Sequence, residues 1–138
     1  MIEFTREAYD DVVAAGEDGV PEEICGVLAG EYGEGHSTVV DTYPTENAAD
    51  APETRYAIDP AEQLAVIEAI EDAGMDVVGF YHSHPAGPTQ PSETDRSRAA
   101  WPGYSYAICA FDGYPYLGSW RWQGDEGFEQ EVVRVVDR

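Results

Sequence analysis

A charge-free segment, Val77-Val78-Gly79-Phe80-Tyr81, constrains the fold of this chain more than any other part of its sequence. Its β-branched and aromatic residues predict a buried strand. The strand continues into His82-Ser83-His84, and Pro85 then ends its hydrogen-bond ladder. Because residues i and i+2 of a strand project from the same face, we expect two imidazoles side by side at the end of a buried strand.

A carboxylate follows this histidine pair. Asp95 lies 11 residues after His84, and two imidazoles with one carboxylate form a ligand set that zinc accepts readily. Three protein ligands plus a water are typical of catalytic rather than structural zinc. The alternative is a strand end with two exposed histidines, but two of the chain's three histidines have the spacing that a metal requires. The sequence therefore predicts a metal site formed by His82, His84 and Asp95.

The rest of the chain predicts the frame around this site. A length of 138 residues suffices for one hydrophobic core, so we expect a single domain over residues 1–138. Helices are predicted at 6–15, 60–73 and 92–100, the second with Leu64, Ile67 and Ile70 on its packed face. Strands are predicted at 24–30, 37–43, 77–82, 104–111, 117–122 and 128–136, with a polar loop at 44–56 and a turn at Asp112-Gly113. This order of elements predicts an α/β fold, a mixed sheet with helices packed on it.

Charge narrows the classes of partner. Seven basic and 28 acidic residues give a net charge of −21, and all seven basic residues are arginine. Such a surface repels nucleic acid, because phosphate binding depends on lysine and arginine. The acids are spread along the whole chain, which favours adaptation to a salty cytoplasm, where screening removes most self-repulsion. Electrostatic steering toward a basic partner is the alternative.

Neither a signal peptide nor an apolar run of membrane-spanning length is evident, so we expect a cytoplasmic protein without a membrane partner. Cys25 and Cys109 have apolar neighbours and no CxxC spacing, which favours reduced core thiols. A disulfide between them is also compatible with the sequence.

Metal-assisted hydrolysis needs two groups besides the ligands. One is a carboxylate that takes a proton from the activated water and passes it to a leaving amine, and the acid pair Glu22-Glu23 before an apolar strand is the best source. The other is a donor to the oxyanion. Ser92, three residues before Asp95, lies on the same side of a helix turn, but serine followed by an acid is also an ordinary capping pair.

The sequence His82-Ser83-His84-Pro85, six residues, then Ser92-Glu93-Thr94-Asp95 resembles the signature of the JAMM, or MPN-plus, zinc isopeptidases. Members of this family carry an upstream catalytic glutamate as Glu-x-x-Gly, which Glu23-Ile24-Cys25-Gly26 matches while Glu22 stands one position early. The resemblance implies an MPN (JAMM) domain with a cytidine deaminase-like mixed β-sheet and one Zn²⁺ per chain. It also implies metal ligation by His82, His84 and Asp95, with Glu23 and Ser92 as the catalytic residues.

Asn47, Arg55-Tyr56 and Asp59-Pro60 also resemble the small single-domain members, so the likeness runs from about Val20 to Phe111. In particular, the chain resembles the haloarchaeal desampylases. This implies an isopeptidase that cleaves between the C-terminal Gly-Gly of a ubiquitin-like modifier and a target lysine. An extended Gly-Gly tail can add to a sheet edge, and we expect the loop containing Asn47 and Arg55 to form one wall of its groove, although a solvated loop is equally compatible.

Two other functions remain open. One is a zinc peptidase that processes a sulfur-carrier protein by the same chemistry. The other is a non-catalytic MPN-type scaffold, or a relative of DNA-repair proteins that share the histidine motif. The complete set of Glu23, His82, His84 and Asp95 disfavours a scaffold, and the acidic surface disfavours DNA. Deamination is not expected, since the His-x-Glu and Pro-Cys-x-x-Cys motifs of deaminase sites are absent.

Overall fold

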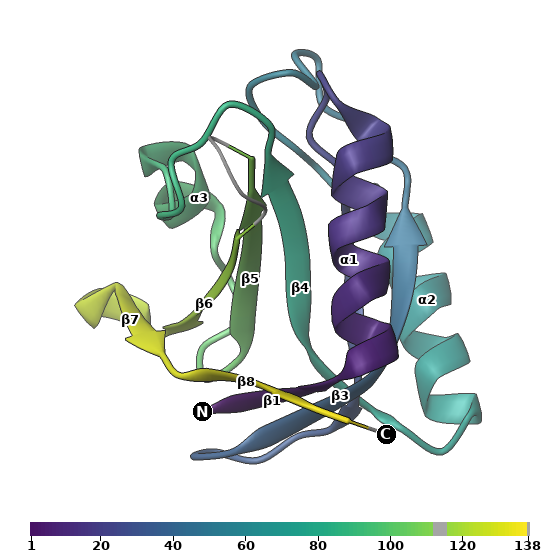
Figure 1. The fold of residues 1–138 in the computed structure, drawn as a ribbon. Helices are drawn as coiled ribbons and strands as arrows, with labels where there is room; N and C mark the ends of the chain where they lie inside the picture. The colour runs from purple at the N-terminus through teal and green to yellow at the C-terminus, as the bar shows by residue number, and fades with distance from the viewer. Residues whose placement is uncertain (112–115, 138) are drawn as a thin grey trace.

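The computed structural model describes residues 1–111 and 116–137. Within these residues, three α-helices lie around a single eight-stranded sheet (Figure 1). The elements in chain order are β1 (Ile2–Thr5), α1 (Arg6–Gly19), β2 (Cys25–Glu31), β3 (Ser37–Thr45), α2 (Pro60–Asp72), β4 (Asp76–His84), α3 (Glu93–Arg98), β5 (Ser105–Ala110), β6 (Tyr116–Trp122), the 3₁₀ helix η1 (Gly124–Glu126), β7 (Phe128–Glu131) and β8 (Val133–Val136). The predicted α/β class is confirmed.

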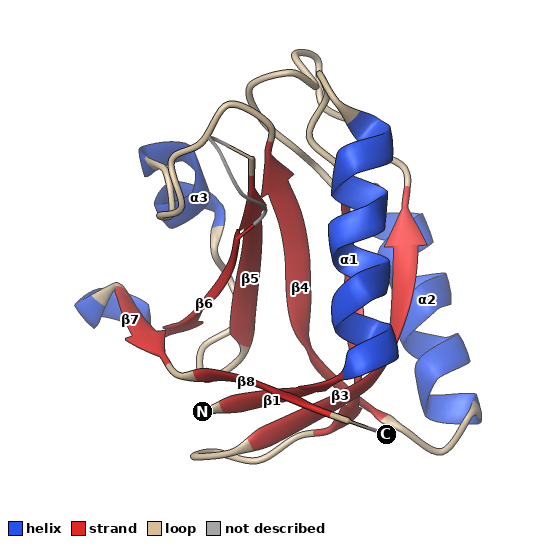
Figure 2. Cartoon of the chain, viewed as in Figure 1, coloured by secondary structure: helices blue, strands red, loops and turns tan. Residues whose placement is uncertain are grey.

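The sheet is mixed and has the strand order β7-β6-β5-β4-β2-β3-β1-β8. Strand β4 lies near its centre, antiparallel to β2 and parallel to β5. Figure 2 shows the sheet curving, so that β1 and β8 run across the lower end of β4 and β5. The upper end of β4, where the two histidines lie, faces loops and α3 instead.

Two hydrophobic clusters cover the two faces of this sheet. One includes Val12 of α1 with Tyr81 of β4, and the other includes Ile70 of α2 with Phe80 of β4. Helices α1 and α2 therefore pack on opposite faces. Because Phe80, His82 and His84 alternate with residues of the other face, the histidines share the face that α2 covers.

Capping residues explain where the helices begin. The Thr5 hydroxyl accepts a hydrogen bond from the amide of Ala8, and the Asp59 carboxylate accepts two from the first turn of α2. The prediction for the packed face of α2 was wrong at one position, because Leu64 is 58% exposed. Val66, Ile67 and Ile70 form the packed stripe, and Leu64 lies about 110° around the helix from its centre.

Two strand predictions were also wrong. The segment 128–136 was expected to form one strand, but it forms β7 and β8, which lie at opposite edges of the sheet with Val132 between them. Strand β1 was not expected, because four residues are too few for the alternation of a strand to be recognised. The predicted turn at Asp112-Gly113 lies outside the described residues.

Cys25 and Cys109 are both buried and free, as expected for core thiols, and burial raises the pKa of each. Among the helices of the described residues, none combines the length and the hydropathy that crossing a membrane would need.

Candidate metal centre

Strand β4 ends with its two histidine side chains on one face. His82 is 1% and His84 6% exposed, and their Nε2 atoms lie 3.1 Å apart. Ser83 is also buried, and its hydroxyl accepts a hydrogen bond from the amide of Ile24 at 2.9 Å. The alternation expected from the sequence therefore places two imidazole nitrogens together and uses the intervening serine to hold the start of β2.

Helix α3 brings Asp95 to the histidine pair. Its Oδ2 atom lies 3.2 Å from Nε2 of both His82 and His84. Three ligands at about 2.0–2.1 Å from a tetrahedral zinc ion would lie about 3.3–3.4 Å from one another. The observed triangle, with sides of 3.1, 3.2 and 3.2 Å, is close to one face of that tetrahedron. The three residues therefore fit a zinc ion.

Electrostatics keep two of these donors, Asp95 and His82, in the states that a metal requires. Burial alone would raise the pKa of Asp95, but hydrogen bonds with His82 and His84 outweigh it and hold the pKa well below its ordinary value. Burial lowers the pKa of His82, which favours the neutral imidazole. A carboxylate anion and a neutral imidazole are the ligand forms that bind divalent metals.

The orientation of each imidazole has its own cause. His84 Nδ1 lies 2.7 Å from the carbonyl oxygen of Pro88. Because that oxygen can only accept, Nδ1 carries the proton and Nε2 keeps its lone pair for a metal. The ring of His82 instead stacks on Tyr56, with centroids 4.3 Å apart and planes inclined by 23°. Tyr56 is thus part of the site, although its sequence position alone did not indicate this role.

Glu23 reaches the centre from the segment before β2. The antiparallel pairing of β2 with β4 sets Cys25 opposite His82. The close packing of β2 against its neighbouring strands requires glycine at position 26, because a Cβ atom there would overlap the Tyr81 ring and the carbonyl of Tyr43. The backbone of Glu23 is held from the other side by Pro52, whose carbonyl accepts its amide at 2.7 Å. Long-range pairing therefore positions this glutamate.

Glu23 is 6% exposed, and its Oε1 atom has no hydrogen-bond partner in the described residues. Burial raises its pKa to about 7, with His84 opposing the increase and Asp95 adding to it. A carboxyl group with a pKa near neutrality can both accept and release a proton in one reaction cycle. Its neighbour Glu22 is exposed, so the geometry favours Glu23 over Glu22 for such a role.

Two sets of three donors share the histidine pair. Ligand atoms of Glu23, His82 and His84 all lie within 4.8 Å of one another, whereas the set with Asp95 is tighter, at 3.1–3.2 Å. The tighter set fits the ligand spacing of a tetrahedral ion. Glu23 is then close enough to act on a molecule bound next to the ion.

Ser92 begins α3 and forms a capping box with Asp95. The Ser92 hydroxyl accepts from the Asp95 amide at 3.0 Å, and the Ser92 amide donates to Asp95 Oδ2 at 2.9 Å. The side chain is exposed, and none of its contacts in the described residues uses the hydroxyl proton. The capping role is therefore observed, and donation to a substrate remains a prediction.

Asn47 and Arg55 belong to the loop beside Glu23. The Asn47 amide group donates to the carbonyls of Glu23 and Arg55 and accepts from the amides of Ala49 and Ala57. With four backbone partners, Asn47 shapes the loop and has little capacity left for a substrate. The Arg55 side chain is exposed. Substrate binding by both residues remains a prediction.

Known proteins are similar to this chain over the whole region that builds the centre. Residues 5–123 match the family described as prokaryotic homologs of the JAB domain. The chain is 43% identical over 136 residues to a desampylase of Haloferax volcanii, covering 96% of this chain and 95% of that protein. It is 41% identical over 120 residues to the CysO-cysteine peptidase of Mycobacterium tuberculosis, covering 86% and 80%.

A solved structure agrees with these relatives. A protein of Desulfitobacterium hafniense, determined in solution, superposes with a TM-score of 0.90 at 28% identity, covering 100% of this chain and 94% of that one. The family match includes the segment before β2, which carries Glu23, as well as β4 with the two histidines and α3 with Asp95. Because one match contains every element that builds the metal centre, this protein belongs to the JAB-domain family of prokaryotes.

Proposed function

We propose that the protein is a zinc-dependent isopeptidase, a desampylase, that hydrolyses the bond between the C-terminal Gly-Gly of a ubiquitin-like small archaeal modifier protein and a target lysine. The observation that carries this proposal is the convergence of His82, His84 and Asp95 beside a buried carboxyl group whose oxygen has no partner. The similarity to a desampylase over 96% of the chain supports the substrate class.

Each residue of the centre has a role in this proposal. One Zn²⁺ on His82, His84 and Asp95 would activate a water for attack on the isopeptide carbonyl. Glu23 accepts the proton at Oε1 and delivers it to the leaving lysine amine, a transfer that its pKa of about 7 allows in both directions. Ser92 donates its free hydroxyl proton to the oxyanion, while its amide holds Asp95 in place.

The strongest alternative is a zinc peptidase that processes a sulfur-carrier protein. It would use the same residues, and the similarity to the CysO-cysteine peptidase supports it. That similarity covers 86% of this chain, against 96% for the desampylase, and the identity is also lower. A lysine conjugate is therefore the better supported substrate. A linear fusion of the modifier to a peptide is the substrate to compare with it in an assay.

We also infer that the protein works in a cytoplasm of high salt. A net charge of −21 without a single lysine repels itself at low ionic strength and is screened over about 3 Å at 1 M salt. A melting temperature that rises steeply with salt would support this inference, and full stability in dilute buffer would contradict it. The acidic shell also disfavours nucleic acid as a partner.

The decisive experiment is incubation with a purified modifier–lysine conjugate at high salt, with and without a chelator. We expect cleavage at the isopeptide bond, loss of cleavage with the chelator, and recovery on addition of Zn²⁺. A matched linear fusion of the same modifier to a peptide distinguishes the two candidate substrates. Purified protein that contains much less than one zinc per chain and shows no cleavage after zinc is added would refute the proposal that the protein is a zinc-dependent isopeptidase.

A further inference from the structure

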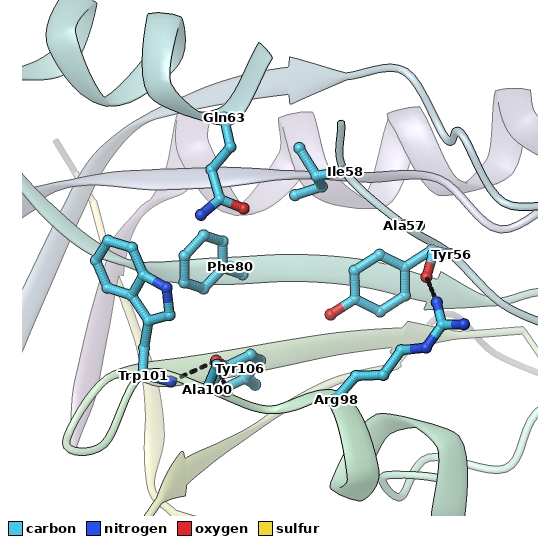
Figure 3. Close-up of a pocket in the computed structure, with 9 residues that line it drawn as sticks. All are labelled: Tyr56, Ala57, Ile58, Gln63, Phe80, Arg98, Ala100, Trp101 and Tyr106. Carbon is cyan, nitrogen blue, oxygen red and sulfur yellow. Dashed lines mark hydrogen bonds between the residues drawn. The ribbon is translucent and has the colours of Figure 1, made fainter. Parts of the chain in front are cut away.

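A cavity of about 260 Å³ lies beside the metal centre, and four of the nine residues that line it are aromatic (Figure 3). Its lining residues include Tyr56, Phe80, Arg98, Ala100, Trp101 and Tyr106. The Tyr106 hydroxyl accepts hydrogen bonds from the amides of Ala100 and Trp101, which ties the wall formed by the chain after α3 to β5. A cavity that combines aromatic rings with a few polar groups suits an apolar side chain or a small ligand.

Two observations relate the position of this cavity to the metal centre. The Tyr56 ring, which lines the cavity, also stacks on His82 at 4.3 Å. Phe80, which also lines the cavity, precedes His82 by two residues on the same face of β4, a separation of about 6.6 Å along a strand. An extended substrate peptide that runs along β4 has the same rise per residue as the strand. If its scissile carbonyl lies at the metal centre, the side chain of its third residue from that carbonyl therefore reaches the cavity.

A second cavity of about 260 Å³ distinguishes the two sides of the centre. It is lined by Glu23, His84 and Ser92, together with Glu53, Thr54 and the turn 85–88, and it shares no residue with the aromatic cavity. A leaving amine must lie near the group that protonates it. If Glu23 delivers that proton, the amine side is this second cavity. The aromatic cavity then lies on the acyl side, where the modifier tail binds.

Charge around the aromatic cavity favours an acidic partner. Arg98 of α3 lines this cavity, and its side chain is exposed. Among the described residues, the ion pairs of arginine involve Arg121 and Arg134 but not Arg98. Arg98 directs Nη1 to the carbonyl of Tyr56 at 3.2 Å, which leaves its other donors free at the cavity rim. Unpaired positive charge on a chain of net charge −21 is thus placed beside the site.

We propose that the aromatic cavity is a specificity pocket for an apolar side chain at the third residue from the scissile bond, on the tail of an acidic modifier protein that pairs a carboxylate directly with Arg98. This inference rests on the proposed function, since it assumes hydrolysis of an acyl–lysine bond at the metal centre. It adds a reason why a tail that ends in Gly-Gly suffices for the chemistry but not for recognition. The two glycines span the centre, and the residue before them fills the pocket.

The test uses short peptides Xaa-Gly-Gly joined through their carboxyl end to the side-chain amine of a reporter lysine, with Xaa as Leu, Phe, Gly or Asp. We expect kcat/KM for Leu and Phe to exceed that for Gly and Asp by about 10-fold or more, the usual discrimination of an apolar pocket. The preference should vanish when the leucine is moved to the second or fourth residue. Equal kcat/KM for Leu and Gly at the third residue, or a preference only for residues on the lysine side, would overturn the proposal.

Variants of the protein test whether the preference for leucine over glycine arises from the aromatic cavity. Ala100→Trp fills the cavity from an exposed position, and we expect it to reduce the Leu-to-Gly ratio to near one. Arg98→Ala should raise KM for an intact acidic modifier conjugate more than for the short Leu peptide. Arg6→Ala is the matched control, because Arg6 is an exposed arginine at the start of α1, at the opposite end of the sheet (Figure 1). An unchanged ratio in Ala100→Trp would place the pocket elsewhere.

A binding measurement separates this inference from the proposed function. If no peptide is cleaved after zinc is added, calorimetry of the free tail peptides with the wild-type protein still decides the matter. Binding of Leu-Gly-Gly about 10-fold tighter than Gly-Gly-Gly, and lost in Ala100→Trp, would support the pocket while the isopeptidase fails. Equal affinities would refute the pocket whether or not the conjugates are cleaved.

Discussion

Two buried polar clusters lie at opposite ends of the same sheet, and they differ in whether their atoms have partners. The lower cluster joins Arg121 of β6 to Glu131 of β7. Arg121 Nε donates to Glu131 Oε1 at 3.0 Å, and its other nitrogens donate to Ser37 and to three backbone carbonyls. Glu131 Oε2 accepts from Ser105 and Ser119 at 2.7 and 2.8 Å. This network is saturated with internal partners.

The metal centre is the opposite case. The buried side-chain atoms without a hydrogen-bond partner, among the residues described, are Glu23 Oε1 and His82 Nδ1, and both belong to the centre. A native fold rarely leaves buried polar atoms unpaired without a functional reason. The lower cluster therefore holds the sheet together, whereas the upper cluster keeps its donors for a metal and a substrate.

The largest expected effect concerns the upper cluster. Glu23→Gln should lower kcat by about 10²–10⁴, because an amide cannot accept the proton of the activated water. Zinc content should stay at the wild-type value, since the tighter donor triangle does not include Glu23. Steady-state kinetics and metal analysis on the same preparation measure both. The exposed Glu22→Gln is the matched control, and an inactive Glu22 variant beside an active Glu23 variant would reverse the assignment.

The lower cluster should respond in stability rather than in activity. Arg121→Met leaves the Glu131 carboxylate buried without its cation, and we expect the free energy of unfolding to fall by about 3–5 kcal/mol. Denaturant titration measures that loss, and zinc content and turnover per folded molecule should not change. The double variant Arg121→Met with Glu131→Gln should recover part of the stability, because it removes the unpaired charge. Lost turnover with normal stability would break the division between the clusters.

Ser92 combines a structural role with a predicted functional role, because it is a helix cap and also a predicted oxyanion donor. Ser92→Ala should lower kcat by about 10²–10³ if the hydroxyl stabilises the oxyanion. Loss of the cap alone should cost about 1 kcal/mol of stability. Kinetics and thermal unfolding of the same variant separate the two contributions, and Ser92→Thr should retain most of both. Unchanged kcat with lower stability would leave Ser92 as a cap only.

Local patterns predicted those features that depend on neighbouring residues. The period of two along a strand placed His82 and His84 on one face, and the Ser-x-x-Asp spacing predicted the cap that presents Asp95. The same reasoning failed for Leu64, because a stripe at i, i+3 and i+6 drifts around a helix and the sheet selects one part of it. It also failed at Val132, where one continuous pattern serves two strands at opposite edges.

The buried strand, its two imidazoles and the helix start that carries the aspartate are predictable from the sequence, because each follows from periodicity or capping within a few residues. The position of Glu23 beside a histidine 59 residues later depends instead on the register between β2 and β4, which is a property of the folded chain. Only the tertiary structure stacks Tyr56 on His82, closes the Arg121 network and assembles the aromatic cavity. These contacts join segments distant in the sequence, and no local pattern encodes which of them will meet.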